Sequence, residues 1–225
     1  IRGFALYSFG NDAVHVRSDN NQILDNYLGT DAGGLVDLGN GGDGVHIGIA
    51  GTPASGNLVR GNVIIGNTSD GVVIAGAGTT GNRIQGNRIG VDVGNGLDGN
   101  RSGVRIQDGA TGNTIGGTVA GDGNVIGGNL QDGVRIVDDS DDNRVQGNTI
   151  GTNRDGSSAL GNSTGVSIGG GAHHNFVGTD GDGTDDDEGN LISGNREGGL
   201  GSGGVFFYGA GTRDNVVAGN LIGVD

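Results

Sequence analysis

The feature that most constrains this chain is an internal repeat of about thirty residues that recurs along the whole sequence. Each unit carries Gly-Val-x-Ile, or a degenerate copy, followed by two patterns in which Asn precedes an aliphatic residue by two positions. Aligning seven units gives four columns of aliphatic or phenylalanine residues: Val14, Val45, Val72, Val104, Val134, Val166, Val205; Val16, Ile47, Ile74, Ile106, Ile136, Ile168, Phe207; Ile23, Val59, Ile84, Ile115, Val145, Val177, Val217; and Leu28, Ile64, Ile89, Ile126, Ile150, Ile192, Ile222. We interpret these columns as the inward-facing positions.

Within Gly-Val-x-Ile, one variable and often polar residue separates the two inward positions, which is the period of a strand with one buried face. Strands this short, bounded by Gly and Asn, leave no room for helices. A single unit cannot bury its own apolar face, so neighbouring units must stack. The sequence therefore predicts an all-β fold, a right-handed parallel β-helix (β-solenoid) with three faces and about seven coils, right-handed because parallel crossovers almost always are.

Three sets of asparagines support this interpretation. Asn tolerates the left-handed conformation of a sharp corner, and stacked Asn amides can hydrogen-bond from coil to coil as a ladder. The sets are Asn21, Asn57, Asn82, Asn113, Asn143, Asn175, Asn215; Asn26, Asn62, Asn87, Asn124, Asn148, Asn190, Asn220; and Asn40, Asn67, Asn100, Asn129, Asn162, Asn195. Three corners in each coil predict three faces.

Two kinds of coil alternate. The short kind repeats at a spacing of 61 residues, from Asn21 to Asn82 to Asn143. The other kind is stretched between its third and fourth columns, over residues 115–126 and 177–192. We expect a two-coil superrepeat in which loops leave alternately from different corners.

Composition excludes several classes of protein. Twelve basic residues, all Arg, against 26 acidic ones give a net charge of −14, which argues against nucleic acid as a partner. The absence of Cys excludes disulfides and thiolate metal sites and suits an extracellular protein. The 55 glycines come with one proline and no Gly-X-Y period, so the chain is not collagen. No apolar run is long enough to span a membrane.

The segments 113–118, 123–129 and 145–152 resemble the repeats of large bacterial secreted and surface proteins with right-handed parallel β-helices, the pectin-lyase-like architecture. That architecture carries polysaccharide lyases, hydrolases and epimerases as well as adhesin shafts and phage tailspikes. The resemblance implies that residues 1–225 form a single β-helix segment. We expect it to contact further solenoid coils or neighbouring copies, in a longer solenoid or an end-to-end fibre.

Enzymes of this architecture resemble one another in placing their chemistry on an outward column of one sheet. Here that column contains Arg105 and Arg135 on neighbouring coils, and two stacked guanidinium groups can hold a uronate carboxylate. The alternative is a solvated face whose arginines balance nearby aspartates. In the adjacent column, Asp43, Asp70 and Asp132 each precede Gly, which fits either turn chemistry or a bound Ca²⁺.

Two further groups are candidate sites. The acidic run 180–188 can offer Ca²⁺ the oxygens of Asp180, Asp182, Asp186 and Glu188, although its spacing matches no EF-hand and a solvated loop is the alternative. The adjacent His173 and His174 are fallback catalytic or zinc-binding residues, but in an extended segment they would point apart.

Signatures of catalysis known from the architecture are missing: Asp-Pro-His of alginate epimerases, Asn-Thr-Asp with Gly-His-Gly of polygalacturonases, and any lysine. We therefore favour a non-enzymatic structural or adhesive segment, extracellular or on the cell surface, with acidic glycans or other surface components as possible ligands. The alternative hypothesis is a lyase, hydrolase or epimerase that acts on acidic glycans along the Arg105/Arg135 groove.

Overall fold

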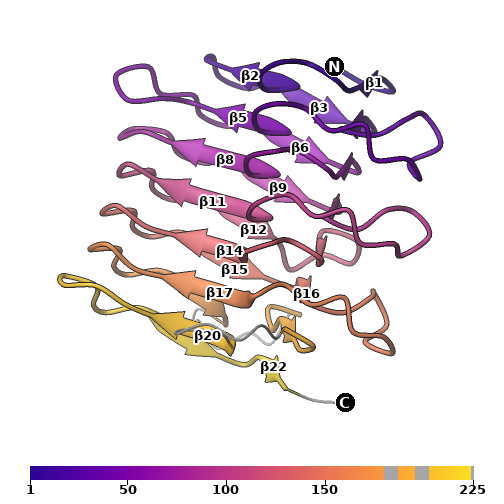
Figure 1. The fold of residues 1–225 in the computed structure, drawn as a ribbon. Coiled ribbons are helices and arrows are strands. Elements are labelled where there is room, and N and C mark those ends of the chain that lie inside the picture. The colour runs from indigo at the N-terminus through magenta and orange to yellow at the C-terminus, as the bar shows by residue number, and fades with distance from the viewer. Residues whose placement is uncertain (180–186, 196–202, 224–225) are drawn as a thin grey trace.

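A computed structural model describes residues 1–179, 187–195 and 203–223. These residues form 22 strands in three sheets, and no helix occurs among them (Figure 1). One sheet has the order β1 (Ala5–Leu6), β4 (Tyr27–Leu28), β7 (Val63–Ile64), β10 (Arg88–Ile89), β13 (Val125–Ile126), β16 (Thr149–Ile150), β19 (Leu191–Ile192) and β22 (Leu221–Ile222). The second has the order β2 (Val14–Val16), β5 (Val45–Ile47), β8 (Val72–Ala75), β11 (Val104–Gln107), β14 (Asp132–Ile136), β17 (Thr164–Ile168) and β20 (Gly203–Phe207). The third consists of β3 (Gln22–Leu24), β6 (Leu58–Arg60), β9 (Arg83–Gln85), β12 (Thr114–Gly116), β15 (Arg144–Gln146), β18 (Phe176–Gly178) and β21 (Val216–Ala218).

The strands pair in parallel with their equivalents one coil away. Ile106 of β11 lies opposite Ile136 of β14, as the column alignment requires. After β1, the chain completes seven coils of three strands each, from β2–β4 to β20–β22. The predicted fold is confirmed: the protein is a right-handed parallel β-helix with three faces and seven coils. No helix in the described part of the chain is long and apolar enough to cross a membrane.

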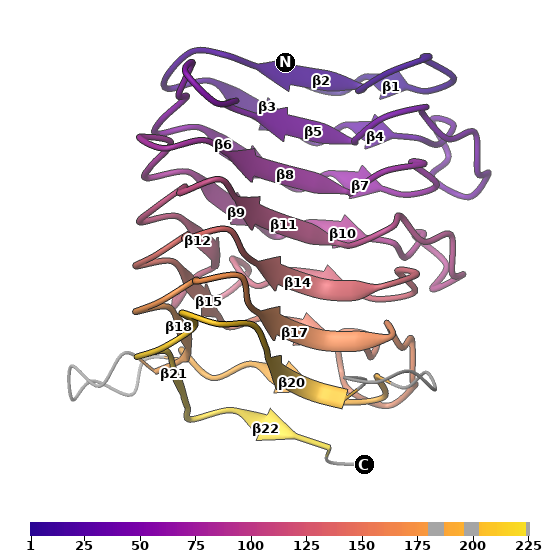
Figure 2. The ribbon, with the colours of Figure 1, turned by 60° about the vertical axis from the view of Figure 1, so that its left-hand side comes forward.

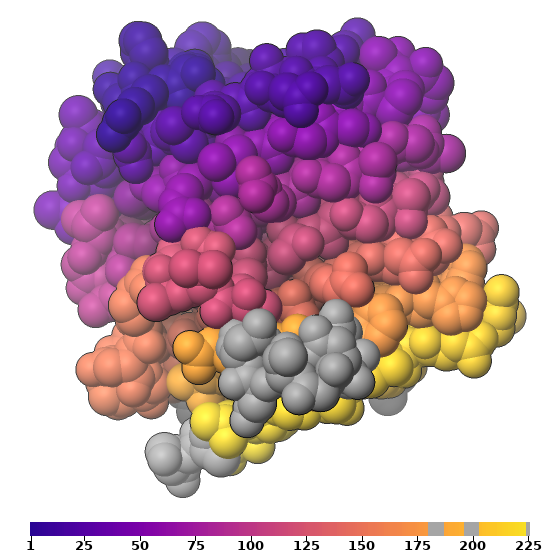
Figure 3. All heavy atoms as spheres, turned by 180° about the vertical axis from the view of Figure 1, so that it is seen from behind, coloured from indigo at the N-terminus to yellow at the C-terminus, as the bar shows by residue number. Residues whose placement is uncertain are grey.

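The four aliphatic columns form the core. Every column member from β5 to β19 is buried. On the last coil, by contrast, Phe207 is 46% exposed and Ile222 45% exposed. Among the described residues no coil packs on the far side of the last coil, which leaves part of its columns exposed. Figure 3 shows the coils as successive bands from the indigo to the yellow end.

The glycine of Gly-Val-x-Ile is explained by close packing at the corner. A Cβ on Gly103 would lie 2.5 Å from the carbonyl oxygen of Gly133 and 2.6 Å from Cγ2 of Ile126. Real Cβ atoms do not approach other atoms so closely, so a side chain here would separate two coils. The repeat requires glycine at this position for space rather than for backbone conformation.

The predicted asparagine ladders are present at all three corners. In the first, Asn143 Oδ1 accepts hydrogen bonds from both the backbone N–H (3.0 Å) and Nδ2 (3.1 Å) of Asn113. Its own Nδ2 donates to Asn175 Oδ1 and to the carbonyls of Ala110 and Asp141. Asn143 is fully buried. Each amide thus satisfies backbone groups that the corners leave unpaired.

Loops leave the solenoid from alternating corners, as the two-coil superrepeat predicts. Three hairpin-like loops close through antiparallel bridges at equivalent positions 61 residues apart, Thr30 with Asp37, Val91 with Leu97 and Thr152 with Ala159. They project from one side of the solenoid at every second coil (Figure 1). In the fourth coil the insertion lies instead between β12 and β13. The insertions are therefore accommodated without interrupting the sheets.

The ladder can be tested by Asn143→Ala. Removing this buried amide leaves the backbone N–H of Asn113 and the carbonyl of Ala110 without partners, at roughly 1 to 3 kcal/mol for each buried group. We expect the free energy of unfolding to fall by at least about 2 kcal/mol in denaturant titrations. Asn21→Ala is the matched control, because Asn21 is the first residue of the same ladder. In this variant the backbone N–H of residue 21 can still donate to Asn57 Oδ1. An equal fall in the free energy of unfolding in both variants would contradict the interpretation that the buried amides of the ladder stabilise the fold.

Candidate functional site

The sheet from β2 to β20 faces the viewer in Figure 2, and its outward positions include ionisable residues in two neighbouring columns. The predicted outward column is in register along the whole sheet: His15 lies opposite His46, and Arg105 opposite Arg135. A second column, with Asp12, Asp43 and Asp70, lies three positions earlier in each coil. This face is the candidate site that the resemblance pointed to.

The aspartates of the second column bind backbone from coil to coil. Oδ1 of Asp12 accepts from the N–H of Asp43 at 2.8 Å, Oδ1 of Asp43 from the N–H of Asp70 at 2.8 Å, and Oδ1 of Asp70 from the N–H of Ser102 at 3.0 Å. Asp43 and Asp70 are buried. These bonds join neighbouring coils instead of closing a local turn, so the column forms a carboxylate ladder. The second oxygens of Asp12, Asp43 and Asp70 contact His15, His46 and Arg101 respectively.

Two of those partners are histidines. His15 Nδ1 lies 3.0 Å from Asp12 Oδ2, and His46 Nδ1 lies 2.7 Å from Asp43 Oδ2. The two imidazole rings stack at 4.8 Å. Arg17 Nε donates to His15 Nε2 at 3.2 Å, while His46 Nε2 is buried without a hydrogen-bond partner. Neither Nε2 atom is therefore free to accept a proton from a substrate.

Burial and pairing act in opposite directions on Asp43 and His46. Burial opposes ionisation of Asp43, but hydrogen bonds from His46, Ser69 and the Asp70 amide outweigh it and lower the pKa of Asp43 below 3.8. Burial also disfavours the imidazolium of His46, but Asp43 outweighs it and raises the pKa of His46 above 6.5. Charged Asp43 and charged His46 therefore stabilise one another.

The arginines of this face are paired with its aspartates. Arg101 holds Asp70 with two hydrogen bonds, Nε to Oδ1 at 3.1 Å and Nη2 to Oδ2 at 2.7 Å. Arg105 Nη1 lies 3.9 Å from the same carboxylate, and Arg135 Nη1 lies 3.5 Å from Asp132 Oδ2. The contacts match the alternative of a face whose arginines balance nearby aspartates.

Arg101 and Tyr208 complete this face but were missed by the sequence analysis. Arg101 precedes the position where Ser102 replaces Asp in the column, and only the corner geometry turns its side chain back onto Asp70. Tyr208 lies under Arg135, whose guanidinium carbon is 5.8 Å from the ring centre, and stacks on Phe206 at 5.4 Å. The one sequence signal for Tyr208 is the alternation of inward and outward side chains along a strand, which places residue 208, two positions after Phe206, on the outer face.

The structure separates the fallback catalytic residues into two places. Arg105 and Arg135 lie on the sheet, whereas His173 and His174 lie at the corner before β18. The chain is not extended there, because His174 has φ +52°, and the two rings lie 4.9 Å apart instead of pointing apart. The condition under which the two side chains would point apart, an extended segment, is therefore not met.

The predicted calcium loop is described only at its end. Asp180, Asp182 and Asp186 lie outside the described residues, so their part in a calcium site stays a prediction. Glu188 is buried, and its Oε1 accepts a hydrogen bond from Gln146 Nε2 at 2.8 Å. In the preceding superrepeat, Gln85 Nε2 donates in the same way to a loop carboxylate, Asp122 Oδ2, at 3.0 Å.

Comparisons with known proteins give little further guidance. No family model and no curated protein sequence matches the chain. Matching solved structures include crystal structures of the periplasmic alginate epimerase AlgG: a double mutant (18% identity, TM-score 0.47, covering 95% of this chain and 38% of that one), a single mutant (18%, 0.47, 96% and 48%) and AlgG itself (17%, 0.39, 93% and 50%). The chain spans half or less of these proteins. We draw no function from matches at this level, and the β-helix assignment rests on the strand pairing.

The Asp43–His46 pair predicts a pH-dependent contribution to stability. Because the pKa of His46 is raised in the folded state, His46 stabilises the fold below pH 6.5, and this contribution is lost as the pH rises through the folded-state pKa. Because the pKa of Asp43 is lowered, Asp43 stabilises the fold above pH 3.8, and this contribution is lost in acid. The difference in unfolding free energy between the wild type and His46→Ala should therefore be larger at about pH 5.5 than at about pH 9. Denaturant titrations at both pH values measure it, and a difference independent of pH would contradict the pairing.

Proposed function

We propose that the chain is a structural segment, a rigid β-solenoid shaft, of a secreted or surface-attached bacterial protein. The observation that carries the proposal is that the charged groups of its most polar face bind one another and the backbone. Asp70, for example, is 1% exposed and accepts from Arg101 and from the amide of Ser102. Such groups stabilise the stack of coils and are not available to a substrate.

The arrangement of the two histidines on this sheet supports the same function. A general base must bring a lone pair within hydrogen-bond reach of the proton that it removes. His46 Nε2 is buried, and His15 Nε2 is occupied by Arg17. The paired aspartates also neutralise the arginines that an acidic glycan would need, and the net charge of −14 repels a polyanion.

Modular construction is the second support for a shaft. The same backbone bonds, asparagine ladders and hairpin-like loops recur every two coils. Stability in such a solenoid is close to a sum of coil and interface contributions. The absence of Cys and the acidic composition fit an extracellular location.

Modularity predicts that one superrepeat can be removed. Deleting residues 82–142 joins Gly81 to Asn143, which restores the corner because Asn143 occupies the position of Asn82. We expect a folded chain, two coils or roughly 10 Å shorter, with cooperative unfolding. Circular dichroism and small-angle scattering measure both properties. Deleting residues 82–146 also removes β15 (Arg144–Gln146), so the joined coil lacks the strand of one face, and this control should fail to fold. Loss of folding in both chains would contradict the modular shaft.

The enzymatic alternative is tested by incubating the chain with pectate, alginate and related acidic glycans. A shaft yields neither unsaturated sugars, seen by their ultraviolet absorbance, nor new reducing ends, nor a changed ratio of uronate epimers by NMR. Activity that disappears in Arg105→Ala, while that variant retains its circular dichroism spectrum, would replace the proposal with a lyase, hydrolase or epimerase.

A further inference from the structure

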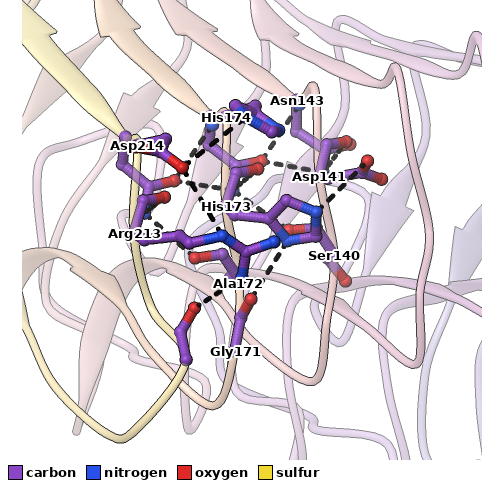
Figure 4. Close-up of polar contacts among 12 residues, drawn as sticks. Ser140, Asp141, Asn143, Gly171, Ala172, His173, His174, Arg213 and Asp214 are labelled. Atoms are coloured by element: carbon purple, nitrogen blue, oxygen red, sulfur yellow. Dashed lines mark hydrogen bonds and ion pairs between the residues drawn. The ribbon is translucent and has the colours of Figure 1, made fainter.

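A cluster of metal-ligating side chains lies at the corner before β15, β18 and β21, away from the sheet face described above (Figure 4). At this corner Asp141 forms a parallel bridge with His173, and His173 forms one with Arg213. The following residues on the same three coils are Asp142, His174 and Asp214. Stacking of coils therefore brings two histidines and several aspartates from distant parts of the sequence together.

The backbone conformation of the corner makes the cluster possible. Every residue that immediately precedes the first Asn ladder has a left-handed φ, and this column consists of Asn20, Gly56, Gly81, Gly112, Asp142, His174 and Asp214. Within this column His174 is the one residue with an imidazole. The sharp turn at φ +52° places its ring 4.9 Å from that of His173, with 61° between the ring planes.

The ligand atoms are close enough to share one ion. One ligand atom each from Asp141, His173 and His174 lies within 4.8 Å of the other two. His173 Nε2 is 3.8 Å from Asp141 Oδ2. Ligand atoms around an ion with bonds of about 2.1 Å lie roughly 3.0 to 3.4 Å apart, so small side-chain rotations suffice.

The hydrogen bonding of His173 leaves the correct nitrogen for a metal. His173 Nδ1 lies 3.1 Å from the carbonyl oxygen of Gly171. A carbonyl only accepts, so Nδ1 carries a hydrogen, and Nε2 is the ring nitrogen whose lone pair can bind a metal beside the carboxylate of Asp141. A histidine ligand whose other nitrogen donates to a backbone carbonyl is the usual arrangement at metal centres.

The local charge also favours a cation. Asp141, Asp142 and Asp214 carry three negative charges against the single positive charge of Arg213. Arg213 is itself held by the carbonyl of Gly211 (3.1 Å) and by Asp214 (3.5 Å). Asp214 Oδ2 lies 3.8 Å from His174 Nε2. The side chains of Asp141 and His173 are 31% and 21% exposed, so an ion can reach them from solvent.

We propose that Asp141, His173 and His174 form a binding site for a divalent first-row transition metal, with Zn²⁺ as the representative ion. Two imidazoles and one carboxylate suit such ions, whereas Ca²⁺ and Mg²⁺ require oxygen ligands. The ion joins the fifth coil, which carries Asp141, to the sixth coil, which carries the histidines. It acts as a cross-coil staple, because a metal bound only by the folded chain stabilises that chain. This site is independent of the function proposed above.

A second group, Asp12, Asp43 and His46, also has ligand atoms within 4.8 Å of one another. Its atoms are already bound: the two carboxylates accept backbone N–H groups, and His46 Nδ1 pairs with Asp43 at 2.7 Å. His46 Nε2 is buried between its neighbours on the sheet. A metal there would have to displace these hydrogen bonds, so the corner site is favoured.

The chain has four histidines, and they divide into a test pair and a control pair. Titration calorimetry with Zn²⁺ on the full chain, without a histidine tag, should give one ion per chain and a raised melting temperature. The double variant His173→Ala/His174→Ala should bind Zn²⁺ at least tenfold more weakly and lose the rise in melting temperature. His15→Ala/His46→Ala should retain both, even where its own stability is lower. Asp141→Asn tests the carboxylate by the same measurements.

Three outcomes would overturn the proposal. The first is no binding of Zn²⁺ to the wild type, and the second is binding that His173→Ala/His174→Ala leaves unchanged. The third is displacement of Zn²⁺ by millimolar Ca²⁺, which would indicate carboxylate ligands alone. Circular dichroism of each variant separates loss of a ligand from loss of the fold, and Zn²⁺ binding to folded His173→Ala/His174→Ala decides the case.

Discussion

The structure depends on the in-register stacking of coils. A coil with three short strands has no second layer of its own against which to bury its apolar face, so its neighbours must cover it. Each backbone group of a strand must then find its partner in the adjacent coil. This requirement explains why Ile106 lies opposite Ile136 and why the glycine at position 103 leaves no space for a Cβ.

Stacking also determines the character of the corners. A three-sided coil turns sharply three times, and each turn leaves peptide groups that no strand partner satisfies. Buried asparagine side chains satisfy them, since one amide both donates and accepts and matches the spacing between coils. The carboxylates of Asp12, Asp43 and Asp70 do the same for the β2-to-β20 sheet, although a carboxylate can only accept. Carboxylates therefore bring a charge that an amide does not.

That charge explains the polar face. Identical columns place like residues about 4.8 Å apart, where like charges repel. His46 and Arg101 neutralise the buried carboxylates of the ladder, and the stacked imidazoles share the same face. The pairing of these groups thus follows from the stacking of aspartates in one column. At the corner with His173, by contrast, the side chains of Asp141 and His173 are 31% and 21% exposed and remain open to solvent.

Much of the fold followed from the sequence alone, because burial imposes a periodic pattern that random placement does not produce. The four aliphatic columns, the three Asn sets and the spacing of 61 residues determined the coils, their register and the alternation of loops. Only the tertiary structure decided which polar atoms meet. The bidentate contact of Arg101 with Asp70 and the approach of His173 to His174 depend on side-chain direction at turns, where a left-handed residue such as His174 reverses the alternation that holds within strands. Residue order specifies which coils are neighbours, but the dihedral angles at the corners determine which of their side chains converge.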